Sequence, residues 1–239
     1  LINVNFKNIL SGNAVHSTCN VTIQKSKFDG SKVSFSVPSG DIEIMNNEFY
    51  NCEEDTINLM QTLPQNFVIQ NNLFRNCDIG RGQLIQSPSW RFSYKVILKG
   101  NKFEKIQSNF KSGKLMVLKD GIGGVEIIDN TFSNIEMHDE SSLFLVEGPM
   151  NVRIWKNEFN IPKTRYAFKV ISLFDNYPVL DARYNRWLDS STALDIRQKA
   201  YDFMIDTNLS YTSFFPAFLS NSSEPVYFES QDYRVKTGN

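Results

Sequence analysis

The sequence predicts an all-β fold, a right-handed parallel β-helix of about eight coils with a helical cap at its C-terminal end. Two observations predict it. A phrase of apolar–polar alternation that ends in an Asn and an aromatic recurs along the chain, and its copies stand 21 to 29 residues apart. The closing aromatics of the copies are Phe6, Phe28, Phe49, Phe74, Phe103, Phe132, Phe159 and Trp187. A supersecondary unit repeated at this spacing is typical of a solenoid.

Each copy begins with a predicted strand. The positions seven and five residues before the aromatic are apolar, as in Val125 and Ile127 of "VEIIDNTF", and the position between them is usually polar. This period of two indicates a strand with one buried face. A second alternating segment follows the aromatic, for example "KVSFSV" (32–37) or "SLFLV" (142–146). We therefore expect at least two strands in each coil, and three in the complete coil.

An Asn stands two residues before the aromatic in most copies. Asn tolerates turn dihedral angles, and its amide both donates and accepts hydrogen bonds. Stacked coils should therefore place these amides in a ladder at one bend of the chain. The predicted ladder consists of Asn47, Asn72, Asn101, Asn130, Asn157 and Asn185.

Leucine-rich repeats have a similar phrase and an overlapping period. Those repeats need an apolar residue three places before the first strand position, where this chain has Ser39, Pro64, Ser93 and Pro149. The far side of each repeat also alternates with a period of two and lacks a helical pattern. We therefore favour a β-helix of the pectin-lyase-like type over a leucine-rich repeat.

The position three residues after the aromatic is also apolar or small. Cys52 and Cys77 occupy it in adjacent copies, so a disulfide between them fits the expected register. The alternative is two small core residues without a bond. Cys19 stands elsewhere in the coil, either free or bonded to a segment outside this chain. The other members of the position are Ile9, Ile106 and Ile135.

The sequence changes character after Trp187, so we expect coils over residues 1–187 and a cap over 188–239 of the same domain. Residues 190–206 begin with Thr192 and Asp195 at the spacing of a capping box. Residues 211–220, "YTSFFPAFLS", are suited to lie across the open end of the stack. The expected helix would place on one face Ile196, Ala200, Phe203 and Met204.

Residues 179–203, "VLDARYNRWLDSSTALDIRQKAYDF", and the following "FFPAFLS" carry a resemblance. They resemble the closing element of extracellular β-helix segments in the bark beetle (Anakonda) family of animal junction proteins. Leu188 stands where that family usually has Gly. The resemblance implies a large single-pass membrane protein with a modular ectodomain that acts in adhesion between epithelial cells. The matching residues are Asp181, Ala182, Tyr184, Asn185, Trp187, Ile196 and Arg197.

The composition excludes some function classes. The formal charge is −1 and the sequence pI about 6.2, so the excess of cations that nucleic-acid binding requires is missing. No run approaches the roughly 20 apolar residues of a membrane span. The chain opens without Met on "LINVNFKNI", part of a repeat, so we expect a piece of a longer extracellular or secreted protein. Three sequons would be glycosylated in such a protein, at Asn20, Asn208 and Asn221.

Many parallel β-helices are polysaccharide lyases or hydrolases, and glycosidases need two carboxylates about 5–9 Å apart in one cleft. The acids at outward positions of the first strand are Glu43, Glu126 and Asp181, which belong to separated coils. The dense acidic segment at residues 52–56 is typical of a solvated turn. His16 and His138 lie in polar stretches without a second metal ligand at suitable spacing. We therefore predict no catalytic residues, no metal and no cofactor.

The outward positions of the first strand are better suited to binding. Several are apolar and are edged by Lys99, Arg153 and Arg183, and Trp and Arg are enriched at binding hot spots. The alternative is that residues 85–94, residues 107–113 or the cap cover this face. The predicted binding surface consists of Met45, Val68, Ile97, Ile128, Arg153 and Trp155.

These observations lead to one functional hypothesis. The chain is a non-catalytic scaffold of a cell-adhesion or cell-junction protein, with an extracellular protein partner or a second copy of itself bound at the outer face. A polysaccharide-binding or polysaccharide-degrading β-helix is the alternative. Glycan binding remains open in either case, and a membrane would be reached only through the rest of the full-length protein.

Overall fold

The computed structural model describes most of the chain. Ile9, Cys19, Phe203 and Met204, for which the sequence makes predictions, lie outside the described residues. The described ranges are 1–7, 15–17, 20–35, 40–59, 64–86, 94–118, 122–147, 151–171, 180–202, 212–220 and 222–227.

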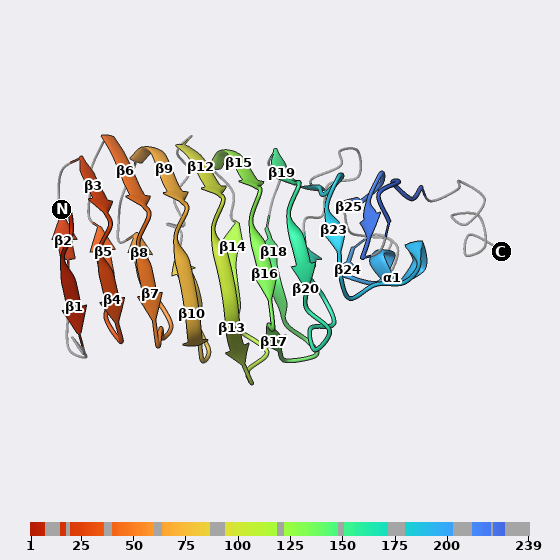
Figure 1. Ribbon diagram of the computed structural model, residues 1–239, viewed down its shortest axis with the longest axis horizontal. Helices are drawn as coiled ribbons and strands as arrows, with labels where there is room; N and C mark the ends of the chain where they lie inside the picture. The colour runs from red at the N-terminus through yellow and green to blue at the C-terminus, as the bar shows by residue number, and fades with distance from the viewer. Residues whose placement is uncertain are drawn as a thin grey trace.

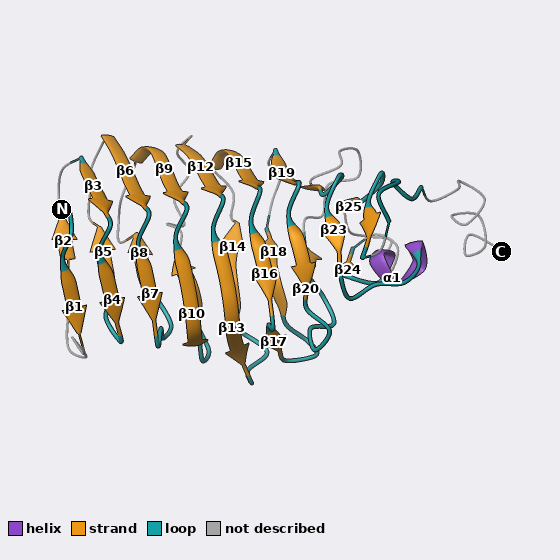
Figure 2. Ribbon diagram, viewed as in Figure 1, coloured by secondary structure: helices purple, strands orange, loops and turns teal. Residues whose placement is uncertain are grey.

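Three parallel sheets form a long stack in which each coil contributes one strand to each sheet in turn (Figure 1). The chain colour runs from red to blue along the long axis, so successive coils lie side by side in sequence order. Strands dominate the described residues, with a single short helix, α1, drawn in purple near the C-terminal end of the stack (Figure 2). The predicted parallel β-helix, with three strands in a coil, is confirmed.

Sheet A holds the first strand of each repeat, and all of its pairings are parallel. Its strands are β3 (Val21–Gln24), β6 (Gly40–Met45), β9 (Pro64–Gln70), β12 (Tyr94–Lys99), β15 (Ile122–Ile128), β19 (Val152–Trp155), β22 (Leu180–Asp181) and β25 (Thr212–Ser213).

Sheet B begins immediately after the Asn bend and carries the repeating aromatic. Its strands are β1 (Asn5–Lys7), β4 (Lys27–Asp29), β7 (Glu48–Tyr50), β10 (Leu73–Asp78), β13 (Lys102–Ser108), β16 (Thr131–Ser133), β17 (Glu136–Met137, paired with β13), β20 (Glu158–Asn160), β23 (Arg186–Trp187) and β26 (Phe218–Leu219).

Sheet C is formed by the second alternating segment of each repeat. These segments are strands, which rules out the helix that a leucine-rich repeat would place there. The strands are β2 (Val15–Ser17), β5 (Val33–Phe35), β8 (Ile57–Leu59), β11 (Gln83–Gln86), β14 (Lys114–Leu118), β18 (Ser142–Val146), β21 (Phe168–Val170) and β24 (Ala200–Tyr201).

The repeating aromatics form one buried column. From Phe6 to Phe159, neighbouring ring centroids are 4.8–5.1 Å apart and the rings are stacked. Trp187 continues the column 4.5 Å from Phe159. Phe144 and Phe168 of sheet C meet the column edge-on, at 5.7 and 5.8 Å. Because burial of one Phe contributes roughly 1.5–3 kcal/mol, this column is a large part of the driving force for coiling.

The predicted Asn ladder is present and buried. Asn101 illustrates its geometry: its backbone N–H and its side-chain amide both donate to Oδ1 of Asn130, at 2.8 and 2.9 Å. The same amide donates to the carbonyl of Ile69 at 2.8 Å. The pattern repeats from Asn47 to Asn185. The Asn of each coil thus provides hydrogen-bond partners for the buried backbone N–H and carbonyl groups at the bend of the neighbouring coil, and buried backbone groups need such partners.

The residue before each ladder Asn has a left-handed backbone. This position is the bend itself, and the short or flexible side chains usually found there point outward. At Gly100 (φ 65°) an added Cβ would lie 2.4 Å from Oδ1 of Asn71, so a side chain here would require the exposed Asn71 amide to move. The other members are Lys25, Asn46, Asn71, Asp129, Lys156 and Tyr184.

Cys52 and Cys77 occupy neighbouring coils in the same position after the aromatic. Both are buried, their Cα atoms are 4.1 Å apart, and the structure joins them by a disulfide. Ile106 and Ile135 continue this column in the buried core.

The predicted boundary between coils and cap at residue 187 is wrong in one respect: the stack continues beyond it. β25 pairs with β22, and β26 pairs with β23, so residues 212–219 add a further rung rather than crossing the open end. Phe214 and Ala217 are buried beneath this rung. Parallel pairing satisfies the backbone groups of β25 and β26, and Ala217 exchanges two backbone hydrogen bonds with Val226, at 3.2 and 2.7 Å.

The cap helix begins as predicted but is much shorter. α1 spans Ala193–Arg197, and Thr192 and Asp195 form the expected capping box. The chain then returns to sheet C, where Ala200 pairs with Phe168. Ala200 therefore lies on a strand and not on a helix face, because pairing with β21 takes precedence over local helix propensity.

We expect Asn130→Ala to lower the free energy of unfolding by about 3 kcal/mol or more, because it leaves a buried N–H of Asn101 and a buried carbonyl of Leu98 without partners. Urea denaturation measures the loss. Thr131→Ala, at the adjacent half-buried and outward position, is the control and should change stability by roughly 0.5 kcal/mol or less. Equal losses for both variants would contradict a structural role for the ladder.

Candidate functional site

The six residues predicted to bind lie on the outer face of sheet A, in two rows that run along the stack. Register pairs Val68 with Ile97 in one row, whose neighbours are Glu43, Glu126 and Arg153. The second row, in chain order, contains Met45, Gln70, Lys99, Ile128 and Trp155.

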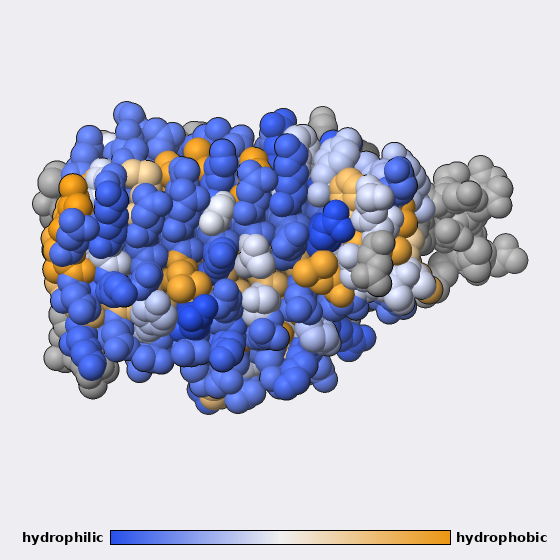
Figure 3. Space-filling model, in the orientation of Figure 1, coloured by the Kyte–Doolittle hydropathy of each residue, from blue (hydrophilic) through white to orange (hydrophobic). Residues whose placement is uncertain are grey.

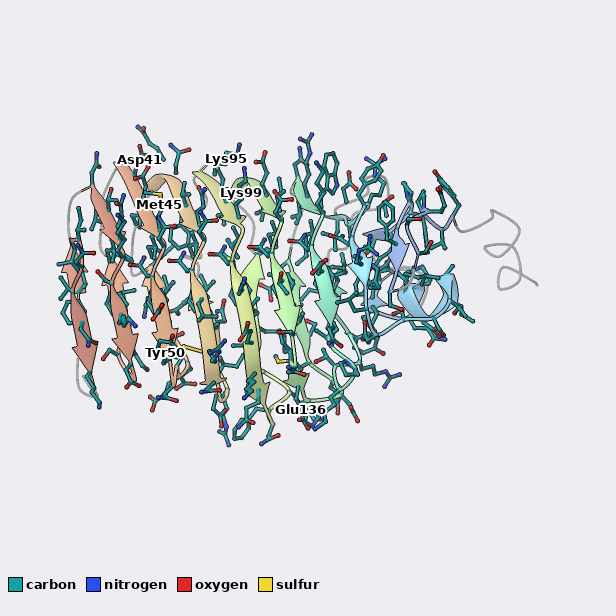
Figure 4. The ribbon with its side chains drawn as sticks, viewed as in Figure 1. Asp41, Met45, Tyr50, Lys95, Lys99 and Glu136 are labelled. Atoms are coloured by element: carbon teal, nitrogen blue, oxygen red, sulfur yellow. A yellow bond between two sulfur atoms is a disulfide. The ribbon has the colours of Figure 1, made fainter. Side chains whose placement is uncertain are left out.

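These rows do not form a continuous apolar strip. Gln70 and Lys99 separate Met45 from Ile128, and the apolar members are all half-buried. Figure 3 shows a face on which hydrophobic areas are small and separated by hydrophilic side chains. In Figure 4, Met45 and Lys99 lie toward one edge of the view, away from Glu136 at the opposite edge, and a yellow bond marks the disulfide.

Part of the proposed cover does not lie over this face. Residues 109–113 connect β13 of sheet B to β14 of sheet C, which is the corner opposite sheet A. Residues 87–93 lie outside the described residues. The outer face of sheet A therefore stays a candidate surface over the coils that the structure describes.

One part of this face has distinctive chemistry, and we call it the Trp155 cluster: Arg153, Trp155, Arg183 and Tyr184. The guanidinium carbons of Arg153 and Arg183 lie 5.4 and 5.8 Å from the indole centroid. The ring of Tyr184 meets the indole edge-on at 5.9 Å. Cations at such distances from an aromatic face are attracted to it, most strongly for Trp. The structure thus brings Trp155 and Arg153 together and leaves Met45, Val68 and Ile97 apart from them.

A half-buried carboxylate supports one side of the cluster. Arg183 binds Asp181 through two hydrogen bonds, Nε–Oδ1 at 2.8 Å and Nη2–Oδ2 at 2.7 Å. Burial raises the pKa of the Asp181 carboxyl, but Arg183 and the Trp155 indole outweigh it, and the pKa lies below its usual value. Asp181 is therefore ionised at neutral pH and holds Arg183 over the indole.

Tyr184 is the member of the cluster that the sequence analysis did not assign to a site. It is 41 % exposed and has φ 61°, a conformation that bulky side chains rarely adopt. Lys, Asn, Asp or Gly occupies the equivalent bend in the other coils. An aromatic at this position of the repeat was a detectable signal, because strained residues concentrate at functional sites.

The outward acids of sheet A are engaged by neighbouring side chains. Glu43 accepts a hydrogen bond from Thr22 at 3.1 Å, and Glu126 pairs with Lys95 at 3.1 Å. Val68 and Ile97 separate Glu43 from Glu126, so these carboxylates lie about 14 Å apart by strand spacing. A glycosidase pair needs a much shorter separation.

The acidic segment 52–56 is a turn between sheets B and C. Glu53 and Glu54 are exposed, whereas Asp55 is half-buried at φ 57°. Burial raises the pKa of Asp55, and the charge of Glu54 adds to the increase. Nδ1 of His138 accepts the backbone N–H of Glu140 at 3.1 Å, and the side chain of His16 lies outside the described part. The described residues contain no group of three acidic, His or Cys side chains arranged for a metal.

A second feature absent from the sequence analysis is a buried lysine beside a serine. Lys114 is 5 % exposed, and its ammonium donates to the carbonyl of Lys111 at 2.8 Å and to Oγ of Ser141 at 2.9 Å. Burial, together with the positive charge of Lys169, lowers the pKa of Lys114 to about 8. A serine activated by a lysine base is a known catalytic arrangement.

The surroundings of this pair favour a structural role. Ser141 has no exposed surface, and its hydroxyl donates to the carbonyl of Gly113. A substrate would therefore have no access to Oγ. The ammonium of Lys114 instead links two turns at the corner between sheets B and C. It bonds the carbonyl of Lys111, in the turn before β14, and the hydroxyl of Ser141, in the equivalent turn of the next coil.

Lys114 should make stability depend on pH. Because its folded-state pKa of about 8 lies below the free value of 10.5, the unfolded chain binds this proton more tightly. The free energy of unfolding of the wild type, relative to that of Lys114→Met, should therefore rise between about pH 8 and pH 10.5, by on the order of 3 kcal/mol. Urea denaturation of both proteins at these two pH values measures the difference. The exposed Lys102 provides the control variant Lys102→Met, which should show no such trend; a flat difference for Lys114→Met would contradict the shift.

The glycosylation sequons are described only in part. Asn20 is exposed at the entrance to β3, and its Oδ1 accepts the backbone N–H of Asp41 at 3.2 Å. Asn208 and Asn221 lie outside the described residues. Occupancy of all three sequons stays a prediction.

The parallel three-sheet coil with its Asn ladder defines the class of protein: a parallel β-helix. The family description "Right handed beta helix region" matches residues 1–159, and the chain belongs to this family. The searches of curated proteins and of solved structures found no match. Within the described residues, no helix is both long and apolar enough to cross a membrane.

Proposed function

We propose that the chain is a non-catalytic module of a larger extracellular adhesion protein, a rigid rod that holds a protein-binding surface at a fixed position. The single observation that carries the proposal is the Trp155 cluster, built on an uninterrupted stack. Family membership alone is compatible with enzymes and with structural modules.

Rigidity follows from the way neighbouring coils are joined. Each coil is joined to the next by parallel strand pairing in three sheets, by a stacked pair of aromatic rings and by a hydrogen bond between two Asn side chains. A close-packed interior of this kind allows little relative movement of its parts. A partner bound at one coil is therefore held at a fixed distance from anything attached to either end.

The Trp155 cluster has the composition of a binding hot spot. Such sites are enriched in Trp, Tyr and Arg and combine a partly desolvated ring with charged groups at its rim. Trp155 is half-buried, whereas Arg153 and Tyr184 are exposed. The surface is thus preorganised by Asp181 and Arg183 before any partner arrives.

An extracellular location is supported by two features. Disulfides persist mainly in oxidising compartments, and Cys52 is bonded to Cys77. Asn20 stands exposed within a sequon. The resemblance of residues 179–203 to the closing element of junction-protein β-helices supports the adhesion role specifically.

A carbohydrate-binding module is the second candidate. The exposed ring of Tyr184 next to Trp155 favours it, because aromatic rings also stack on the apolar faces of sugars. A polysaccharide-degrading enzyme is a weaker candidate, because Glu43, Glu126 and Asp181 are engaged by their neighbours and lie in separate rungs.

We expect no turnover when the chain is incubated with a panel of neutral and acidic polysaccharides, measured as new reducing ends and as unsaturated products. Because the outer carboxylates of sheet A do not form a catalytic pair, Glu126→Gln should leave this result unchanged. Robust turnover that disappears in Glu126→Gln would overturn the non-catalytic proposal.

We expect the fluorescently labelled chain to bind cultured epithelial cells saturably, and Trp155→Ala to bind at least tenfold more weakly while keeping the wild-type melting curve. Truncation of a hot-spot Trp typically costs 2 kcal/mol or more. Arg165→Ala is the matched control, since Arg165 stacks on Tyr166 at 4.9 Å outside the cluster.

Treatment of the cells before binding separates the two candidates. Loss of binding after protease treatment, with binding retained after glycosidase treatment, supports a protein partner. The opposite sensitivity would move the Trp155 cluster to the carbohydrate candidate.

A further inference from the structure

The charges around Trp155 are unequally compensated. Arg183 is neutralised by Asp181 through two hydrogen bonds. Arg153 and Lys156 are exposed on the same rung as Trp155, and neither forms an ion pair with a described residue. The exposed Asp129 at the preceding bend likewise forms no ion pair with a described residue. Within the described part of the chain, Arg153, Lys156 and Asp129 therefore keep their charges without an ion-pair partner.

Arg153 differs from the basic side chains of this face that form ion pairs; Lys99, two rungs away, also forms none with a described residue. Lys95 is paired with Glu126 on the neighbouring rung at 3.1 Å, and Arg183 with Asp181 on its own rung. Register places Arg153 between Glu126 and Asp181, the two acids that these cations occupy. Arg153 is thus flanked by carboxylates that already have partners, and its guanidinium rests on the indole instead.

A guanidinium has five N–H donors in a planar fork that matches a carboxylate. The contact between Arg153 and the indole of Trp155 is a cation–π contact and not a hydrogen bond. The N–H donors of Arg153 therefore stay available for an acceptor. Beside it, the indole and the phenol of Tyr184 offer an apolar surface with a polar rim. The combination fits a ligand that carries a carboxylate next to an apolar side chain.

We propose that the Trp155 cluster docks an acidic protein segment, with a Glu or Asp side chain on Arg153 and an adjacent apolar side chain on Trp155 and Tyr184. This inference rests on the proposed function and adds the chemistry of the partner. Lys156 contributes long-range attraction, because opposite charges steer association and this effect weakens with salt.

The probe is a short capped peptide in which glutamates flank a Tyr-Leu pair, together with the same peptide carrying glutamine at every glutamate. Isothermal titration against the full chain measures affinity. We expect the glutamate peptide to bind at least tenfold more tightly than the glutamine peptide, and its affinity to fall as salt is raised. Arg153→Ala should remove this preference, whereas Arg153→Lys should restore part of it.

The control variant is Arg165→Ala, which removes an exposed arginine that also stacks on an aromatic, outside the cluster. It should bind the glutamate peptide as the wild type does. Arg153 is exposed, so its variants should keep the fold, which a thermal melt verifies.

Three outcomes would overturn the inference: equal binding of the two peptides, equal losses in Arg153→Ala and Arg165→Ala, or tight binding of a sulfated glycan that excludes the glutamate peptide. Failure here is distinguishable from failure of the proposed function. The dependence of cell binding on Trp155 would persist if only the acidic preference is wrong.

Discussion

The structure depends on one interaction, the hydrogen bonding of each Asn amide to the bend of the preceding coil. A parallel strand stack has identical backbone demands at every turn, and a bend that left an N–H and a carbonyl buried without partners would cost several kcal/mol per coil. The amide of Asn130 meets both demands at once, since its oxygen accepts the backbone N–H of Asn101 and its nitrogen donates to the carbonyl of Leu98. Because the partner from Asn47 to Asn185 is the equivalent Asn, the ladder also fixes the register in which the aromatics stack.

Fixed register then decides the chemistry of the surface. Side chains that meet on the outer faces come from equivalent positions of adjacent coils, so ion pairs such as Arg75–Glu104 and Lys27–Glu48 join neighbouring rungs. Most of these pairs are exposed and contribute little to stability. They matter in another way: they determine which charged groups are left without a partner, and Arg153 is such a group on sheet A.

The interior was predictable because repetition makes it visible in the sequence. Asn101 and Phe103 have counterparts in every neighbouring copy, and a buried strand tolerates few alternatives at such positions. The helix was predicted correctly only at its start, since Thr192 and Asp195 are a local signal. Its end was set by pairing of Ala200 with Phe168, a contact between distant residues that no local pattern reveals. Lys114 and Ser141 were missed for the same reason, as they meet only when two turns stack.

The binding surface was harder to predict than the interior, because the repeat pattern does not reveal which outward side chains contact each other. Equivalent positions suggested one apolar strip, yet the residues that contact each other are aromatic where the other copies are not: Trp155, where others have Met45, Gln70, Lys99 or Ile128, and Tyr184, where others have Asn71 or Gly100. Tyr184 adopts an unfavourable backbone conformation, and Trp155 exposes part of an apolar ring to water, yet neither residue adds to the stability of the stacked coils. In a protein whose coils are otherwise interchangeable, adjacent departures that also contact each other are therefore the strongest structural argument for a selected surface.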